Sequence, residues 1–375
     1  MKMRKLIPRL DYRYSLQDVF ISLKGVFTNK VDTEYLSSLF KTEDIFFVNH
    51  ARTGIRIALN SVNLKENAKI GVLVYNCKTV FNSVKVAGYK SVFIDVTNNF
   101  QIDLEDLKRK KDEIDAIVIT HLYGIPADME EVRKILPANI PIIEDCAHSL
   151  LSRYKKKLTG TYGDIAVYSF GKGKLPSVGD GGFVVVNNKD FLTNIKKGHD
   201  KLPGQNVIAE LKYVFMSLIL AFLHNPVVYG FFTYPFIKKI DEKSDLGGKY
   251  EHKESRTLKV NIVLFLKKMN KLNDLIAIKK RNSLQNAEII KTHFKKHIVP
   301  ICKNSDWNYF MLPLISDNRD EVMVIYQKKG FEIGKHFSKS IQWATDFGYK
   351  NKTCPNAEIL VEKVLTIPTY KSFIK

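Results

Sequence analysis

Polar residues that could take part in catalysis or ligand binding stand where apolar runs of the sequence end or begin. Asp145 ends the run PIIED, and Lys174 follows the run IAVYSF within a glycine-rich loop. Arg52 and Thr53 open the amphipathic stretch ARTGIRIALNSV, where the first backbone N–H groups of a helix attract an anion. Ligands of open α/β sheets bind beyond the carboxyl ends of the strands, so we expect these residues to meet there.

A carboxylate, an amine and an anion cradle on successive strand ends suit pyridoxal phosphate. The amine forms a Schiff base with the aldehyde, the carboxylate keeps the pyridine nitrogen protonated, and the helix amides hold the phosphate. The glycines around Lys174, in YSFGKGKLPSVGDGG, let the backbone pass close to a bound group without Cβ clashes. A lysine that carries protons to and from a substrate needs this freedom.

Buried strands and amphipathic helices are the elements that must position these residues. The runs KIGVLVYN, SVFIDV, AIVITHLYG and GGFVVVNN do not alternate with polar residues, which is typical of strands covered on both faces. The segment PADMEEVRKIL between two such runs has helical spacing. The sequence therefore predicts an α/β protein with a largely parallel sheet.

Composition excludes several classes of protein and favours anionic partners. The 375 residues are 45% hydrophobic and 26% charged, which is ordinary for a globular chain, and the formal net charge is +20. The four cysteines are far apart and form no C-x-x-C pair, so neither a metal site nor a disulfide framework is predicted; they are Cys77, Cys146, Cys302 and Cys354. The basic N-terminus lacks the apolar region of a secretory signal, which predicts a cytoplasmic protein.

Four segments together resemble one family. IIEDCAHSL, HLYGIPADMEEV, GYKSVFIDVTNNFQIDLEDL and GDIAVYSFGKGKLPSVGDGGFVVVNN are similar, in order and spacing, to the DegT/DnrJ/EryC1/StrS family of pyridoxal-phosphate-dependent sugar aminotransferases. The resemblance covers residues 45–200 well. It implies fold type I of the pyridoxal-phosphate-dependent transferases, in which a large domain with a mostly parallel sheet flanked by helices is followed by a smaller C-terminal α/β domain. We place the large domain at residues 1–205, an apolar insertion at 206–245 and the small domain at 246–375.

The resemblance implies roles for residues close to the cofactor. Lys174, five positions after Ser169, matches the Schiff-base lysine, and Asp145 matches the acid that pairs with the pyridine nitrogen. His148 matches the residue near the ring hydroxyl. A solvated loop lysine, a helix cap and a core histidine are the structural alternatives for these three positions. The pattern G-x-x-x-x-G-K-[ST] of nucleotide-binding loops is absent, because Leu175 follows the lysine.

Other roles implied by the resemblance lie farther from the lysine. Ser169 matches a hydroxyl that helps to hold the phosphate, and Arg52 and Thr53 supply the helix-end contacts, unless they only begin a helix. Arg256 falls where the family has a residue that reaches the phosphate of the neighbouring subunit. His336 matches a histidine near the substrate.

The sequence departs from the family at Cys77. The family has an aromatic ring stacked on the cofactor at this position, whereas the chain reads VYNCKTV. A cysteine can pack against the ring as a small polarizable group, the register can differ by a residue or two, or the thiol can be an ordinary buried hydrophobe.

A second departure is the segment 213–236, which contains no Asp, Glu, Lys or Arg. His224, Asn225 and Pro226 interrupt it after about 11 apolar residues, short of the roughly 20 that a span requires. Two short helices bent at this point, flanked by lysines, favour an interfacial or re-entrant insertion at a membrane surface. The alternative is a buried core or subunit contact.

The predicted function is a pyridoxal-phosphate-dependent aminotransferase of polysaccharide biosynthesis. The resemblance implies that an amino group passes from an amino acid, expected to be glutamate, to a nucleotide-linked keto-sugar, and that the protein is a homodimer. If segment 213–236 contacts the inner face of the cytoplasmic membrane, a lipid-linked substrate becomes an option. The presence of Lys174 argues against relatives that lack the lysine and catalyse dehydration. A non-catalytic basic membrane-associated protein that retains the fold is the alternative, and no nucleic-acid module is recognised.

Overall fold

A computed structural model of the chain describes residues 5–11, 14–28, 31–236, 253–293, 300 and 304–373. Statements below concern these residues. Cys302, the last part of the predicted insertion at 237–245 and the first residues of the predicted small domain at 246–252 lie outside them.

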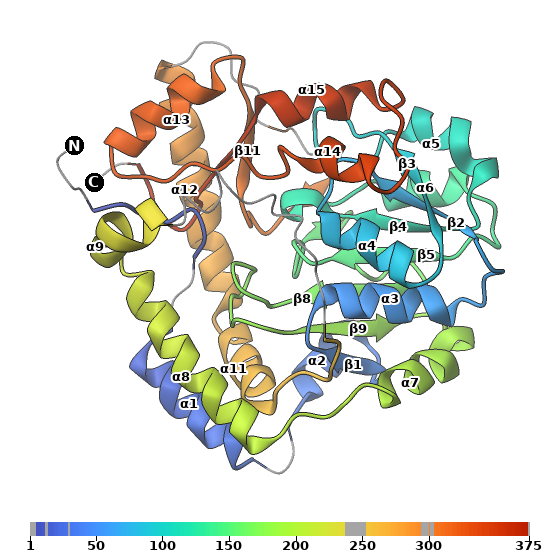
Figure 1. Ribbon diagram of the computed structural model, residues 1–375, viewed down its shortest axis with the longest axis horizontal. Coiled ribbons are helices and arrows are strands. Elements are labelled where there is room, and N and C mark those ends of the chain that lie inside the picture. The colour runs from blue at the N-terminus through green and yellow to red at the C-terminus, as the bar shows by residue number, and fades with distance from the viewer. Residues whose placement is uncertain are drawn as a thin grey trace.

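A seven-stranded sheet lies at the centre of the large N-terminal part, in the order β1-β9-β8-β5-β4-β2-β3 (Figure 1). Strands β3, β2, β4, β5 and β8 are parallel, whereas β9 is antiparallel to both β8 and β1. The prediction of a mostly parallel sheet is confirmed. The strands are β1 (Ile45–Val48), β2 (Lys69–Leu73), β3 (Lys90–Ile94), β4 (Ala116–Thr120), β5 (Ile142–Cys146), β8 (Ile165–Ser169) and β9 (Gly182–Val186).

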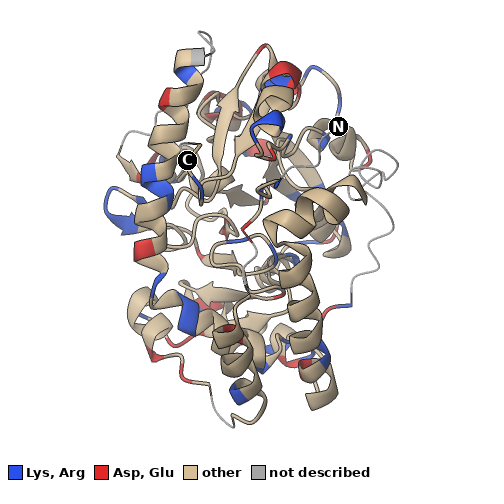
Figure 2. Cartoon of the chain, turned by 90° about the vertical axis from the view of Figure 1, so that its left-hand side faces the viewer, with Lys and Arg blue, Asp and Glu red and all other residues tan. Residues whose placement is uncertain are grey.

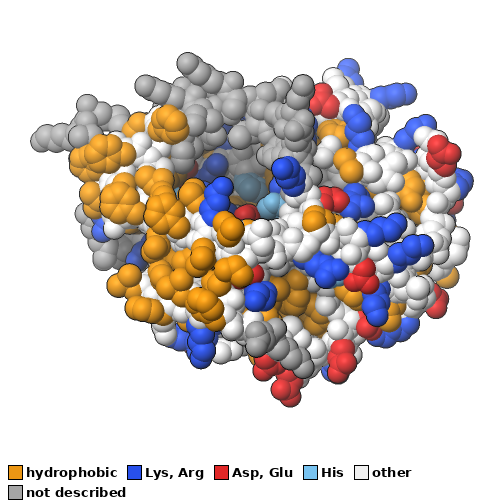
Figure 3. All heavy atoms as spheres, turned by 60° about the horizontal axis from the view of Figure 1, so that its bottom comes forward, with side chains coloured by type: hydrophobic (Ala, Val, Ile, Leu, Met, Phe, Trp, Pro, Cys, Tyr) orange, Lys and Arg blue, Asp and Glu red, His pale blue; other side chains and the backbone are white. Residues whose placement is uncertain are grey.

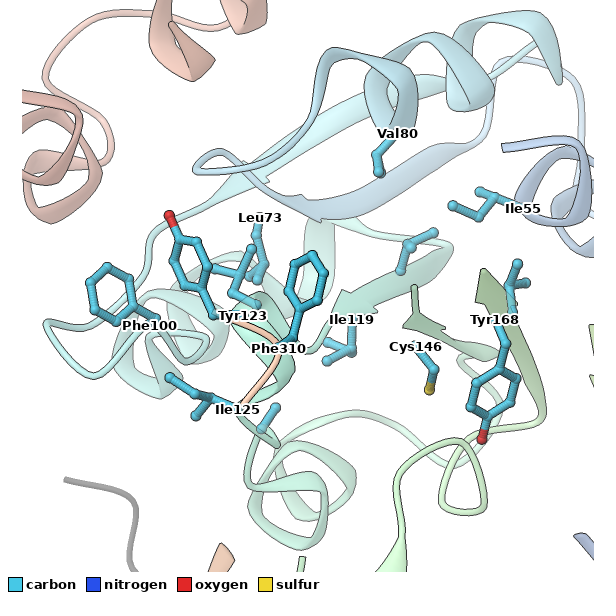
Figure 4. Close-up of a cluster of buried hydrophobic side chains, with 14 of the residues drawn as sticks. Ile55, Leu73, Val80, Phe100, Ile119, Tyr123, Ile125, Cys146, Tyr168 and Phe310 are labelled. Atoms are coloured by element: carbon cyan, nitrogen blue, oxygen red, sulfur yellow. The ribbon is translucent and has the colours of Figure 1, made fainter. Parts of the chain in front are cut away.

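Helices flank the sheet and explain why its central strands are buried along their whole length. Every residue of β4, β5, β8 and β9 is buried, as expected for strands covered on both faces. Figure 4 shows Ile55 and Val80, from two of these helices, on one side of the strands that carry Ile119 and Tyr168. The flanking helices and short turns are α2 (Glu34–Phe40), α3 (Ala51–Ser61), α4 (Lys78–Val86), α5 (Leu104–Lys110), η1 (Lys111–Glu113), η2 (Leu122–Gly124), α6 (Met129–Ile135), η3 (Lys189–Phe191) and α7 (Leu192–Asp200).

The C-terminal part mixes helices with short strands and shares one core with the large sheet. Phe310, from this part, packs among buried residues such as Tyr123 and Ile119 (Figure 4). Strand β11 pairs with β12, and β10 pairs with β6 of the N-terminal part. The division into domains stays a prediction. The N-terminal part contributes β6 (Arg153–Tyr154) and β7 (Lys157–Leu158) to the small sheet that includes β10. The C-terminal elements are α11 (Lys259–Met269), α12 (Leu272–His293), β10 (Ser305–Asp306), β11 (Leu312–Ile315), α13 (Arg319–Lys328), α14 (Ser340–Thr345), α15 (Pro355–Lys363) and β12 (Val364–Ile367).

The apolar segment forms helix α8 (Val207–Leu223), followed by α9 (Pro226–Val228) and the π-helix η4 (Tyr229–Thr233). Asn206 caps the start of α8, and Pro226 begins the next helix after a bend of 65°. Helix α8 lies beside α1 (Leu16–Val26) and α11 (Figure 1). In the described chain no single helix is long and apolar enough to cross a membrane, although this bent pair together has a suitable length and composition.

Gly182 is a position where the fold needs a residue without a side chain. A Cβ here would lie 2.4 Å from the carbonyl oxygen of Tyr168 and 3.2 Å from the backbone nitrogen of Ala51, the first residue of α3. Strand β9 therefore comes close to both β8 and the start of α3, which is why glycine stands in the GDGG stretch.

We predict that Gly182→Ala lowers the free energy of unfolding by about 2–3 kcal/mol, because two backbone segments must move apart. Denaturant unfolding measures the change. Gly204→Ala is the matched control, since a Cβ at Gly204 meets no atom within 4 Å, and it should leave stability nearly unchanged. Equal stabilities of the two variants would contradict the close approach.

Candidate functional site

A pocket of about 310 Å³ lies where β2, β4, β5 and β8 end. Thr120, Asp145 and Ser169, from the carboxyl ends of three of these strands, form part of its wall, as expected for an open α/β sheet. The sequence-predicted residues that line it are Arg52, Cys77, Asp145, His148, Ser169 and Lys174. The structure thus brings together most of the predicted site.

Asp145 is a buried carboxylate at the end of β5. Its Oδ2 accepts a hydrogen bond of 3.0 Å from the Thr120 hydroxyl, and its Oδ1 accepts one of 3.1 Å from the Ala147 backbone N–H. Burial raises the pKa of Asp145, although these hydrogen bonds and the nearby Lys174 act against it. Among the residues described, no cationic side chain forms an ion pair with Asp145, so its charge is left for a ligand to match.

Lys174 is partly buried and reaches into the same pocket. Its Nζ lies 5.6 Å from the centroid of the Phe310 ring, and it forms no ion pair within the described chain. Burial lowers the pKa of Lys174, opposed by Cys77 and Asp145 nearby. An amine with a lowered pKa is more often neutral and therefore a better nucleophile.

Glycines shape the loop that carries Lys174. Gly173, Gly179 and Gly181 have φ values of +76°, +147° and +142°, which side chains rarely allow. The loop is closed by bonds from the Lys174 N–H to the Gly171 carbonyl, 3.0 Å, and from the Gly173 N–H to the Ser177 hydroxyl, 2.9 Å. The glycine-rich stretch is therefore a folded turn that aims the lysine.

The helix starts at α3 and α4 supply the predicted anion cradle. His50 and Cys77 precede these helices in extended conformations, and neither side chain caps the helix. His50, Arg52, Cys77 and Thr79 line the pocket. Two helix N-termini directed at one pocket favour an anionic group there, because their N–H groups carry partial positive charge.

Aromatic rings form the side of the pocket near His148. The His148 ring stacks on Phe310 at 4.5 Å and 23°, and on Phe337 at 6.0 Å and 19°. Phe337 lines the pocket and has a φ of +61°, an unusual value for a residue with a side chain. Burial lowers the pKa of His148 well below its ordinary value, helped by Lys174 and His336, so its imidazole is neutral at physiological pH.

Three predicted residues do not line the pocket. Thr53 is fully buried, and its hydroxyl donates a hydrogen bond of 2.9 Å to the Asn49 side chain. Successive helix residues point about 100° apart, so Thr53 turns away from the pocket when Arg52 faces it. Arg256 pairs with Asp200 at 3.4 Å, away from the wall. His336 lies behind it, 5.9 Å from the His148 ring, and burial lowers the pKa of His336 to about 3.

Several pocket residues were not predicted from the sequence. Asn76 lies just beyond the end of β2, and its side-chain amide donates a hydrogen bond of 2.8 Å to Thr120, the last residue of β4. Both residues could have been predicted from the sequence, because ligands of open α/β sheets bind beyond the carboxyl ends of the strands. His50, Asp180 and Phe337 also line the pocket, but they come from loops and carried no periodic signal.

His121, Glu144 and Cys146 form a buried cluster whose donor atoms lie within 4.8 Å of one another. The His121 Nδ1 accepts from the Ala127 N–H, which leaves a proton on Nε2 for Glu144, 2.9 Å away. Glu144 also accepts from three backbone N–H groups, including Gly160. Burial acts to raise the pKa of Glu144, but these hydrogen bonds lower it overall. Both ring nitrogens are used, so the cluster supports β5 without a metal.

A second cavity of about 450 Å³ lies on the other side of Lys174. Four lysines from α11, from α12 and from the link between them line its wall, beside the carboxylates of Asp11, Asp18 and Asp274. Figure 2 shows basic residues at intervals along α12. The lysines are Lys267, Lys268, Lys271 and Lys279.

Comparison with protein families gives a direct match. The pattern of the DegT/DnrJ/EryC1/StrS aminotransferase family matches residues 15–206, which include the glycine-rich loop and β5. The chain belongs to this family. The predicted resemblance is confirmed.

Individual relatives match parts of the chain. It is 31% identical over 177 residues to a GDP-perosamine synthase of Escherichia coli O157:H7, which is 46% of this chain and 48% of that protein. The chain therefore spans about half the length of this relative. It is also 25% identical over 362 residues to an uncharacterized protein of Methanocaldococcus jannaschii, covering 93% of this chain and 84% of the other.

Solved structures support the fold over nearly the whole chain. An aminotransferase from Psychrobacter cryohalolentis has a TM-score of 0.74 at 18% identity, covering 95% of this chain and 92% of its own. An E. coli GDP-4-keto-6-deoxy-D-mannose-3-dehydratase with bound hydrated PLP has a TM-score of 0.73 at 18% identity, covering 97% and 96%. The fold class is confirmed, and one fold carries both kinds of enzyme.

Pyridoxal phosphate, the cofactor of this family, fits the residues of the first pocket. Asp145 offers a buried negative charge without an ion-pair partner in the described chain, and Lys174 offers an amine. The uncapped starts of α3 and α4 offer N–H groups for a phosphate.

We predict that Asp145→Asn raises the melting temperature of the cofactor-free protein at neutral pH. The folded state raises the pKa of Asp145, so ionisation of this carboxyl destabilises the fold increasingly as the pH rises above the ordinary aspartate pKa, and fully above the raised pKa. The gain should shrink as the pH falls towards the ordinary aspartate value of about 3.9. Thermal unfolding between pH 4 and 8 measures it. The exposed Asp112→Asn variant is the control, and a gain of equal size there would contradict the account.

Proposed function

We propose that the protein is a pyridoxal-phosphate-dependent aminotransferase that moves an amino group to a keto-sugar. The observation that carries the proposal is that one pocket is lined by both the Lys174 amine and the Asp145 carboxylate, which form no ion pair in the described chain. When bound, the cofactor supplies an electron-withdrawing ring that makes a proton on the substrate carbon acidic.

The side chains of the pocket divide the remaining tasks. Asp145 would hold a proton on the ring nitrogen, with Thr120 and Ala147 fixing its orientation. Arg52, Ser169 and the N–H groups at the starts of α3 and α4 would hold the phosphate. Lys174 would hold the cofactor and move a proton at the substrate carbon, since its lowered pKa suits an amine that both gives and takes protons.

The cavity beyond Lys174 supports a nucleotide-linked acceptor. Its lysines, on α11, on α12 and between them, are positioned to bind phosphate oxygens, and Lys174 borders both cavities. Relatives named GDP-perosamine synthase and UDP-4-amino-4,6-dideoxy-N-acetyl-beta-L-altrosamine transaminase carry nucleotide sugars in their names. We propose glutamate as the donor on the family resemblance alone.

Assembly and location complete the proposal. A homodimer would allow Arg256 to act on a neighbouring subunit, which fits its place outside its own pocket. The exposed apolar helix α8 supports contact with a membrane surface at the cytoplasmic face. A lipid-linked acceptor is the alternative substrate under this proposal.

Two other functions make different predictions. A dehydratase shares the fold. The family resemblance implies that relatives of that kind lack the lysine, whereas this chain has Lys174. A non-catalytic basic membrane protein would have no reason to keep Lys174 and Asp145 in one pocket, and it would not bind the cofactor.

We predict that Lys174→Ala abolishes the visible absorbance of the lysine-bound cofactor and slows glutamate-dependent conversion to the pyridoxamine form by about 10²–10⁴-fold, since proton transfer is lost. Stopped-flow absorbance measures both.

Two further variants serve as controls for the loss of the Lys174 amine. Lys174→Arg keeps the charge but should be equally inactive, and the exposed Lys201→Ala should behave as the wild type. An active Lys174→Ala variant, or a wild type that binds no cofactor, would rule out the proposed aminotransferase.

We predict that Lys267→Gln together with Lys271→Gln raises the KM for a nucleotide-linked acceptor about tenfold, because two charged contacts to phosphate are lost. The glutamate half-reaction should keep its rate. Lys280→Gln, at an exposed lysine of α12 that does not line the cavity, is the matched control. An unchanged KM in the double variant would place the acceptor elsewhere.

A further inference from the structure

Helix α8 presents a row of large apolar side chains to the exterior. Ile208, Phe215 and Phe222 are 77%, 64% and 66% exposed, and they recur every seven residues along one side of the helix. Further exposed apolar residues of this helix are Val207, Leu211, Met216, Leu218 and Ile219. A core helix would bury such a row, so α8 has an apolar side without a partner in the described chain.

Helix α1 extends this apolar surface. Leu16, Phe20 and Phe27, at its two ends and middle, are exposed, and α1 lies beside α8. Val26 and Val214 pack together between the two helices and hold them in place. We call the exposed apolar residues of α1 and α8, together with Val227, Phe232 and Phe236, the apolar face.

Charge is arranged to favour an anionic surface. The acids of both helices are turned inward: Glu210 is buried and accepts from the Lys259 N–H, and Asp18 bonds Ser15 and Lys268. Lys24 and Lys212, on the same helices, are exposed. Figure 3 shows the apolar side chains gathered on one side of the molecule, with basic side chains at their border.

Helix α8 is also joined to the rim of the cofactor pocket. The Tyr213 hydroxyl donates to the Val178 carbonyl at 2.9 Å and accepts from the Asp180 N–H at 3.2 Å. Gly179 and Asp180 line the pocket. In Figure 3 a hollow with histidine side chains lies next to the apolar cluster. One hydroxyl therefore connects the helix of the apolar face to the loop that carries Lys174.

We propose that the apolar face docks on the surface of an anionic lipid bilayer. The 65° bend after α8 suits helices that lie in the interface plane, with apolar side chains embedded and lysines at the headgroups. Anionic headgroups are the partner that charge favours for this face, because they neutralise a chain with a formal net charge of +20.

Docking has a consequence for the substrate, and this consequence rests on the proposed function. Because Tyr213 ties α8 to the pocket rim, the mouth of the pocket would be held beside the bilayer. An acceptor sugar anchored to a lipid would then reach Lys174 without leaving the membrane.

The test is co-sedimentation of the full chain, with pyridoxal phosphate present, with two kinds of vesicle. One contains phosphatidylglycerol and phosphatidylcholine, and the other contains phosphatidylcholine alone. The variant combines Ile208→Ser, Phe215→Ser and Phe222→Ser; the matched control replaces three exposed apolar residues elsewhere, Val86→Ser, Val324→Ser and Ile359→Ser.

We expect the wild type and the control to sediment with the phosphatidylglycerol vesicles more than with phosphatidylcholine alone. The α8 variant should lose at least about a hundredfold in partition coefficient, since three embedded side chains are removed. A wild type that stays in the supernatant, or an α8 variant that sediments like it, would overturn the proposal. Light scattering gives a further contradicting outcome: a wild type that is oligomeric but binds no vesicle, together with an α8 variant that is monomeric. The apolar face would then be the contact with a second copy of the chain.

Cofactor absorbance separates this proposal from the proposed function. The three proteins should bind pyridoxal phosphate equally, because the replaced residues do not line the pocket. If none of the three proteins binds the cofactor but the wild type still binds vesicles, the proposed aminotransferase function is wrong and the docking proposal is retained. If the wild type binds the cofactor normally but binds no vesicles, the docking proposal is wrong and the proposed function is retained.

Discussion

The structure depends on a carboxylate and an amine that the fold buries in one pocket without giving either an ion-pair partner in the described chain. Burial raises the pKa of Asp145 and lowers the pKa of Lys174, so both charges cost free energy unless a ligand compensates them. A ligand with a protonatable ring and a reactive carbonyl removes that cost at both ends. Such a trade of stability for binding is common at active sites.

Neighbouring elements hold this pair in place. Parallel strands bring Asp145 and Thr120 to one edge, while positive φ angles at Gly173, Gly179 and Gly181 fold the loop that returns Lys174 over it. The close approach of β9 to α3 at Gly182 sets the distance between this edge and the helix start that faces the pocket. The polar cluster of His121 and Glu144 lies beneath the same edge.

The sequence predicted the fold class, the parallel sheet and most of the pocket, because buried strands and the polar residues at their ends leave local patterns. It missed His50, Asp180 and Phe337, whose positions depend on how loops far apart in the chain meet. Thr53 was predicted together with Arg52, but its side chain is buried and only Arg52 lines the pocket. The apolar run of α8 was visible, but the exposed side of α1 was not, because Leu16, Phe20 and Phe27 stand among polar residues.

The most direct measurement is borohydride reduction of the protein incubated with pyridoxal phosphate, followed by peptide mass spectrometry. Reduction makes any bond between the cofactor and an amine permanent. The account predicts a pyridoxyl group on Lys174, and none on the neighbouring Lys172. A label on another lysine, or no label on the folded protein, would contradict it.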